Sequence, residues 1–171
     1  TSIGSTLVAG NSNAHWSDVF KEADLALYHS KRGGRDQYTI YDDSIGASAI
    51  ERNWLEAEIM RAIQSEAFCL HYQPRIDLKT HKVVCVEALL RWNHPERGYI
   101  SPGTFIPVCE DMGVIDQVGI QVFEAACRQL TAWHQSGFDV RLAINVSPKQ
   151  FQHEDFIDLC AQTAADPTVP I

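Results

Sequence analysis

The sequence predicts an α/β fold, and three observations point to it. Residues 68–75 and 82–92 are strand-like runs joined by a short polar turn, which is the pattern of an antiparallel hairpin. A helical stretch over residues 104–136 follows, with apolar side chains at helical spacing. A strand over residues 141–147 and a helix over residues 148–165 continue the alternation. Strands that alternate with helices are typical of α/β proteins, and we expect the beginning of a barrel.

The first part of the chain predicts a smaller group of elements. Residues 2–9 indicate a short strand, and residues 17–32 indicate a helix with Ser17 as its N-cap and glycines after its last turn. The apolar residues of this helix fall on one side, which predicts that this side is buried. A second short strand is expected over residues 37–41.

Small and polar residues after this strand predict a linker over residues 44–50. A helix with one apolar side is expected over residues 51–64. We therefore expect residues 1–43 to end one domain and residues 51–171 to begin a second.

The charge of the chain argues against nucleic-acid polymers as partners. The chain has 14 Lys and Arg against 22 Asp and Glu, a net charge of -8, and no basic stripe. Such a charge balance repels a phosphate backbone. The five cysteines include no C-x-x-C pair, and the seven histidines show no metal-ligand spacing, so we expect reduced thiols and packed or solvated imidazoles.

Hydropathy predicts no contact between this segment and a membrane. No apolar run approaches the roughly 18 residues that cross a bilayer. The first residues also lack the basic and then apolar profile of a signal peptide. We therefore expect a cytoplasmic location, and attachment of a longer parent protein to a membrane through other segments stays open.

Alternation along the second strand of the hairpin separates two faces. One face is wholly apolar, and the other holds Glu87, Leu89 and Arg91 near the C-terminal end of the strand. On the next predicted strand, Asn145 lies at the corresponding height. A hairpin centred on the polar turn places Gln73 beside Glu87. Because α/β barrels hold their active sites at the C-terminal ends of their strands, we expect these polar side chains to meet at one rim.

Each of these residues also has a structural interpretation. Glu87 and Arg91 could form an ion pair inside the barrel, although burial of such a pair is costly without further partners. Asn145 could cap a loop or the following helix, and Gln73 could be a hydrogen-bonding residue at a sheet edge. The spacing alone leaves both interpretations open.

Four short strings follow one another along the second predicted domain. They are Tyr72-Gln73-Pro74, Glu87-Ala88-Leu89-Leu90-Arg91-Trp92, Ser101-Pro102 with Phe105-Ile106-Pro107, and Asn145-Val146-Ser147. In order and spacing they resemble the successive signatures of the EAL family. The resemblance implies a partial TIM-like barrel with an antiparallel first strand. For the parent protein it implies a metal-dependent phosphodiesterase that hydrolyses cyclic-di-GMP to linear pGpG.

The resemblance also implies roles for individual residues. Glu87 and Asn145 resemble catalytic metal ligands, and oxygen ligands of this kind suit Mg²⁺ or Mn²⁺, of which the complete domain would hold two. Arg91 resembles a clamp on a substrate phosphate, for which its forked donors are suited. Gln73 and Leu89 resemble substrate contacts.

The family's remaining metal carboxylates and its catalytic lysine come from later strands. We therefore expect this chain alone to be inactive and its parent to be the hydrolase. The alternative is a receptor that keeps the nucleotide pocket but has lost catalysis. The resemblance further implies a homodimer of the parent.

The first 43 residues resemble the C-terminal end of a GGDEF diguanylate cyclase domain. The strings are Ser2-Ile3-Gly4 and Ala23-Asp24-Leu25-Ala26-Leu27-Tyr28. Lys31 and Arg35 occupy the places of cations that touch GTP phosphates in active members, but cations at a helix C-terminus are also favoured by the helix dipole. The defining GGDEF turn is absent from the sequence, so no cyclase activity is expected of this chain. A role of this part in dimerisation and relay is a further alternative.

Overall fold

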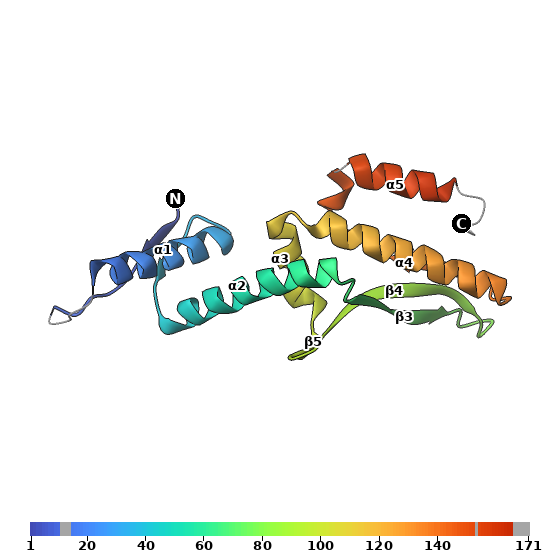
Figure 1. Cartoon of the computed structure of the whole chain (residues 1–171), viewed down its shortest axis with the longest axis horizontal. Coiled ribbons are helices and arrows are strands. Elements are labelled where there is room, and N and C mark those ends of the chain that lie inside the picture. The colour runs from blue at the N-terminus through green and yellow to red at the C-terminus, as the bar shows by residue number, and fades with distance from the viewer. Residues whose placement is uncertain (11–14, 153, 166–171) are drawn as a thin grey trace. The chain divides into compact units, whose positions relative to one another are not determined.

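The computed structural model describes residues 1–10, 15–152 and 154–165 (Figure 1). The chain divides into two compact units, Thr1–Leu55 and Glu56–Ile171. Within the described stretches, none of the helices combines the length and the hydropathy of a membrane span. The elements are β1 (Ile3–Ser5), α1 (Trp16–Arg32), β2 (Tyr38–Ile40), α2 (Asp43–Gln64), β3 (Phe68–Ile76), β4 (Val83–His94), β5 (Gly98–Ile100), α3 (Pro102–Met112), α4 (Ile115–Gln135), β6 (Arg141–Ile144), the 3-10 helix η1 (Gln150–Gln152) and α5 (Glu154–Ala164).

In the first unit a parallel pair of strands packs against α1. β1 and β2 have three residues each, so both are shorter than the sequence predicts. The fully buried Ser30 of α1 joins them to the helix, because its Oγ donates to Ile3 O at 2.9 Å. Ser17 as the N-cap of α1 is wrong: the helix begins at Trp16, and the imidazole of His15 accepts the Ser17 N–H at 3.4 Å.

The helix α2 begins at Asp43 rather than at residue 51. The carboxylate of Asp42 accepts two backbone N–H groups of the first turn, at 2.9 and 3.1 Å. These bonds satisfy amides that have no partner inside the helix. The expected irregular linker over residues 44–50 is therefore helical.

Gly46 is one of the small residues that predicted the linker. A glycine is typical of a linker, yet this one lies inside α2. A Cβ at Gly46 would stand 2.5 Å from Tyr41 Oη, so the glycine makes room for a neighbouring ring. The division into a first domain over residues 1–43 and a second over 51–171 stays a prediction.

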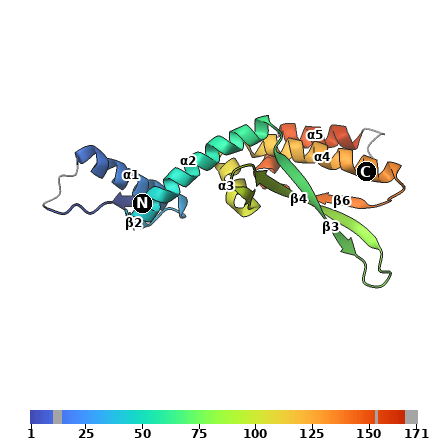
Figure 2. The ribbon, with the colours of Figure 1, turned by 60° about the horizontal axis from the view of Figure 1, so that its bottom comes forward.

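The second unit is built on β4, which pairs with three other strands. β3 runs antiparallel to it with Gln73 opposite Glu87, as predicted. β6 runs parallel to residues 85–88 of β4, and β5 pairs antiparallel with residues 92–94. The sequence pattern did not indicate β5, which has only three residues. In the described stretches this sheet is four-stranded and open, so it has the expected antiparallel first strand but closes no barrel (Figure 2).

Helices lie along this sheet. In both views α5 lies along α4, and α4 runs beside the β3–β4 hairpin (Figures 1 and 2). The helix predicted over residues 104–136 is two helices, because Gly113 adopts a left-handed conformation (φ 70°) and ends α3. The helix predicted over 148–165 is η1 followed by α5, with residue 153 outside the described stretches. The strand predicted over 141–147 has four residues.

Three aromatic rings lie at the centre of the core. The ring centroids of Phe68, Trp92 and Phe105 are 5.4–5.5 Å from one another. Rings at such distances attract one another beyond the effect of the area that they bury. Trp92 lies on the predicted apolar face of β4, on which Val86 and Ala88 are also buried.

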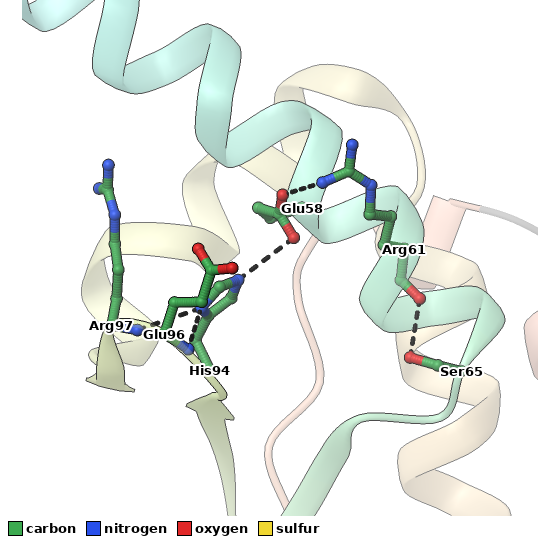
Figure 3. Close-up of polar contacts among 6 residues, drawn as sticks. All are labelled: Glu58, Arg61, Ser65, His94, Glu96 and Arg97. Atoms are coloured by element: carbon green, nitrogen blue, oxygen red, sulfur yellow. Dashed lines mark hydrogen bonds and ion pairs between the residues drawn. The ribbon is translucent and has the colours of Figure 1, made fainter.

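A buried histidine joins the end of α2 to the end of β4 (Figure 3). Nδ1 of His94 accepts the backbone N–H groups of Glu96 and Arg97, both at 3.2 Å. Nε2 therefore holds the proton and donates to Glu58 of α2 at 3.2 Å. Glu58 also pairs with Arg61 on the same helix. These contacts hold the last turns of α2 against the sheet.

We expect Glu58→Ala to lower the free energy of unfolding by about 1–3 kcal/mol, because a buried imidazole N–H loses this acceptor. Urea denaturation of the 171-residue chain measures the change. Glu58→Gln is the matched control, since its amide oxygen still accepts the N–H, and we expect it to lose less than half as much. An alanine variant as stable as the glutamine variant would contradict this account.

Candidate functional site

Glu87 lies at the centre of the site. Its side chain on β4 is 22% exposed. Asn145 Nδ2 donates to Glu87 Oε1 at 3.0 Å, and Arg75 Nη2 donates to Glu87 Oε2 at 2.8 Å. Each carboxylate oxygen thus has one donor, the first neutral and the second charged.

Strand register explains why these side chains meet. Glu87 pairs with Gln73 of β3 on one side and with Ala143 of β6 on the other. Arg75 lies two residues after Gln73 on β3, and Asn145 lies two residues after Ala143, one residue past the end of β6. Residues two apart in extended chain share a face. Diagonal neighbours of this kind are within reach of long side chains. Of the four side chains expected at one rim, Glu87 and Asn145 are in contact, and Gln73 is the cross-strand neighbour of Glu87.

The surroundings of Glu87 favour its charged form. The hydrogen bond from Asn145 and, next, that from Arg75 hold the pKa of the Glu87 carboxyl below its ordinary value. The positive charge of Arg75 acts in the same direction. Glu87 is accordingly an anion at neutral pH and stays one at mildly acidic pH.

Arg91 does not pair with Glu87. It lies four residues further along β4, about 13 Å at the usual rise of a strand. Its Nη1 donates instead to Leu90 O at 2.8 Å. A Glu87–Arg91 ion pair, the structural alternative, is therefore wrong, and Arg75 makes the ion pair at Glu87.

A cavity of about 290 Å³ lies between β4, β6 and the helices α3 and α4. Leu89, Arg91 and Asn145 line it, and most of the remaining wall is apolar. Its volume is near the lower end of the range of small-molecule sites. Gln73 and Glu87 do not line it, so the predicted residues form two adjoining groups that Asn145 connects.

Arg75 is the site residue that the sequence analysis missed. The alternation that selects Glu87 on β4 also places Gln73 and Arg75 on one face of β3. The same pattern in the sequence could therefore have identified Arg75. The amide of Asn145 contacts Glu87 rather than capping the loop that follows it.

Lys31 and Arg35 belong to the first unit. Lys31 is exposed in the last turn of α1. Arg35 follows the helix with a positive φ of 61°, and its N–H donates to Ser30 O at 3.2 Å. Their contact with a nucleotide phosphate stays a prediction.

The side chains at Glu87 are partly suited to a hard divalent cation. Glu87 and Asn145 offer carboxylate and amide oxygens, which such ions prefer. Within residues 1–10, 15–152 and 154–165, no group of three or more His, Cys, Asp or Glu side chains could hold a metal ion. The described residues thus supply two candidate ligands but not a complete site.

Comparison with known proteins places this geometry in a family. A family model of the EAL domain matches residues 56–170. The bifunctional diguanylate cyclase/cyclic di-GMP phosphodiesterase MucR of Pseudomonas aeruginosa is 38% identical over 158 residues, which cover 92% of this chain and 23% of MucR. The cyclic di-GMP phosphodiesterase PdeR of Escherichia coli is 35% identical over 139 residues, which cover 80% of this chain and 21% of PdeR.

A solved structure has the same fold. The PaMucR phosphodiesterase in complex with c-di-GMP is 38% identical with a TM-score of 0.62, over 64% of this chain and 45% of that one. The chain spans less than a quarter of the length of the two curated relatives. Because the family model covers well over half of its residues, the chain belongs to the EAL domain family.

Proposed function

We propose that the protein containing this segment is a phosphodiesterase that hydrolyses cyclic-di-GMP to linear pGpG. The observation that supports this most is the contact between Glu87 of β4 and Asn145, which directly follows the adjacent parallel strand β6, in an EAL domain. The names of MucR and PdeR support the activity, and the complex of PaMucR supports the nucleotide.

In this proposal Glu87 and Asn145 are ligands of Mg²⁺ or Mn²⁺, two ions in the complete domain. Such ions polarise phosphoryl oxygens and lower the pKa of bound water. Further ligands would come from carboxylates outside the described residues. Arg91 binds a phosphate of the nucleotide, and Leu89 beside it lines the same cavity. Gln73 contacts substrate from the neighbouring strand.

Arg75 has a supporting electrostatic role. A carboxylate must be deprotonated to bind a metal ion. Arg75 contributes to the lowered pKa of Glu87 through a hydrogen bond and through its charge. Glu87 is therefore available as a ligand at neutral and mildly acidic pH.

A receptor that binds cyclic-di-GMP without hydrolysing it is the alternative function. An assay of hydrolysis distinguishes this receptor from the phosphodiesterase. The inactivity of this chain alone, the homodimer and the cytoplasmic location stay predictions.

The first 43 residues fit the end of a GGDEF domain in this proposal. The match to MucR covers 92% of the chain and so extends well before residue 56, where the EAL match begins. MucR is named as a diguanylate cyclase as well as a phosphodiesterase, which supports the assignment. Lys31 and Arg35 would then be the cations nearest to a GTP phosphate.

We expect Glu87→Gln to abolish turnover in the protein that contains this segment, because an amide is a poorer ligand for a hard cation than a carboxylate. Turnover is measured by chromatography of the pGpG formed from cyclic-di-GMP with added Mg²⁺ or Mn²⁺. The control is Glu124→Gln, an exposed residue of α4 that should keep wild-type activity. Activity of Glu87→Gln within a few-fold of wild type would return Glu87 to a structural role.

Arg91→Ala should weaken nucleotide binding about 10- to 150-fold, since a charge-assisted hydrogen bond contributes about 1.5–3 kcal/mol. Calorimetric titration with cyclic-di-GMP in the absence of divalent metal measures affinity without turnover. Arg141→Ala, at the opposite end of β6 from Asn145, is the control. Equal affinity of the Arg91 and Arg141 variants would remove Arg91 from the phosphate site.

Arg75→Ala should raise the pKa of the Glu87 carboxyl toward its ordinary value, because a hydrogen bond and a positive charge that favour the anion are lost. The ¹³C shift of this carboxyl, followed through an acid titration of the 171-residue chain, reports the change. Protonation of Glu87 should then begin at a higher pH than in wild type. Lys79→Ala, in the exposed hairpin turn, should leave the midpoint unchanged, and an unchanged midpoint in Arg75→Ala would refute the pairing.

A further inference from the structure

Gln150 of η1 is a polar side chain in the interior of the second unit. It is 3% exposed. Its Oε1 accepts the backbone N–H of Ser147 at 2.8 Å, and its Nε2 donates to Ile115 O at 3.3 Å. A buried amide is tolerated when its donor and its acceptor are both engaged, as they are here.

Gly119 of α4 makes the space for this amide. A Cβ at Gly119 would stand 1.7 Å from Nε2 of Gln150 and 3.0 Å from its Cδ, so the end of the Gln150 side chain would have to move to admit any other residue. Glycine in the interior of a helix is unfavourable relative to alanine. The glycine is therefore explained by the glutamine that packs on it.

Gln150 fixes the chain immediately after Asn145. The last paired residue of β6 is Ile144, so Asn145 lies where the chain leaves the sheet. Two residues later, the N–H of Ser147 is held by Gln150, and its Oγ donates to Glu110 Oε1 of α3 at 2.5 Å. Asn145 thus lies between the end of the sheet and a second fixed point.

The position of Asn145 matters because its amide must reach Glu87 across 3.0 Å. A side chain on an unpaired segment reaches a fixed partner only if the backbone on both sides is held. The strand holds one side, and the pair of bonds at Ser147 holds the other.

We propose that Gln150, packed against Gly119, is a positioning residue that holds Asn145 in place as a metal ligand. The proposal rests on the proposed function, since it takes Asn145 to be a ligand. It assigns no contact between Gln150 and the ion or the substrate.

The test uses the protein that contains this segment and measures three quantities for each variant. They are Mn²⁺ affinity from the electron paramagnetic resonance signal of free Mn²⁺, hydrogen exchange at the Ser147 amide, and Tm. Gln150→Ala should weaken Mn²⁺ binding about 10- to 100-fold, the usual effect of removing a residue that orients a ligand. It should also speed exchange at Ser147 and lower Tm.

The double variant Gln150→Ala with Gly119→Ala separates positioning from stability. Removal of the amide takes away the closest contact of the new methyl group and leaves Phe156 Cε2 at 3.3 Å, which needs to give by only a few tenths of an ångström. Because alanine also favours the helix, Tm should rise above that of Gln150→Ala. The Ser147 N–H still lacks its acceptor, so Mn²⁺ affinity should stay low. Recovery of Mn²⁺ affinity together with Tm would overturn the proposal, because Gln150 would then only support the fold.

Two further variants complete the design. Gln152→Ala, in the same 3-10 helix but exposed, should behave as wild type in all three measurements. Asn145→Ala tests the ligand assignment in the proposed function: if it leaves Mn²⁺ affinity unchanged, Asn145 is no ligand, and that assignment and the positioning role both fail. If Asn145→Ala weakens Mn²⁺ binding and Gln150→Ala does not, the positioning role alone is wrong. Should Gln150→Ala not fold, Gln150→Met, of similar size without the hydrogen bonds, takes its place with the same expected loss of affinity.

Discussion

The constraint on which the second unit depends is that β4 pairs along both edges while burying only one face. β3 occupies one edge, and β6 and β5 share the other. Val86, Ala88 and Trp92 are buried on one face, which leaves Glu87 on the other. Since a shift of one residue would exchange the faces, burial of the apolar residues also determines where the carboxylate points.

The neighbours of Glu87 act on it in two ways. Asn145 and Arg75 both favour the ionised carboxylate, and each does so by occupying one of its oxygens. With Asn145 and Arg75 as donors, each oxygen of the Glu87 carboxylate accepts one hydrogen bond, and Arg75 offsets its negative charge. A cation that reaches Glu87 therefore meets a carboxylate that is already ionised and already oriented by its two donors.

Local pattern in the sequence accounts for much of this arrangement. The hairpin register that places Gln73 opposite Glu87 follows from the period of two and the length of the polar turn, and the structure confirms it. The pattern could not show β5, because three residues form a strand only once β4 is beside them. It also placed the start of α2 too late, because the small and polar residues after β2 have the composition of a linker, whereas Asp42 caps a helix there and Gly46 packs against Tyr41.

As an ion-pair partner for Glu87, the sequence offered Arg91 and not Arg75. Arg91 lies on the same strand as Glu87, whereas Arg75 lies across the hairpin, and only the register makes Arg75 the nearer of the two. The contact between Gln150 and Gly119 is harder still to predict from the sequence. It brings together two segments about 30 residues apart, and it depends on how one amide packs where a side chain at 119 would otherwise lie.

That fit also constrains the order in which the two positions can change during evolution. Alanine at 119 meets the amide of Gln150, so a lineage that changes position 119 first must displace that amide from its two hydrogen bonds. A lineage that first acquires a small side chain at position 150 can then accept alanine at 119 with only the 3.3 Å contact to Phe156 Cε2 to relieve. After that step, a glutamine that returns to position 150 cannot place its amide where it now lies until position 119 has reverted. The order of the two substitutions therefore decides whether the hydrogen bonds of position 150 are lost before or after the methyl group arrives at position 119.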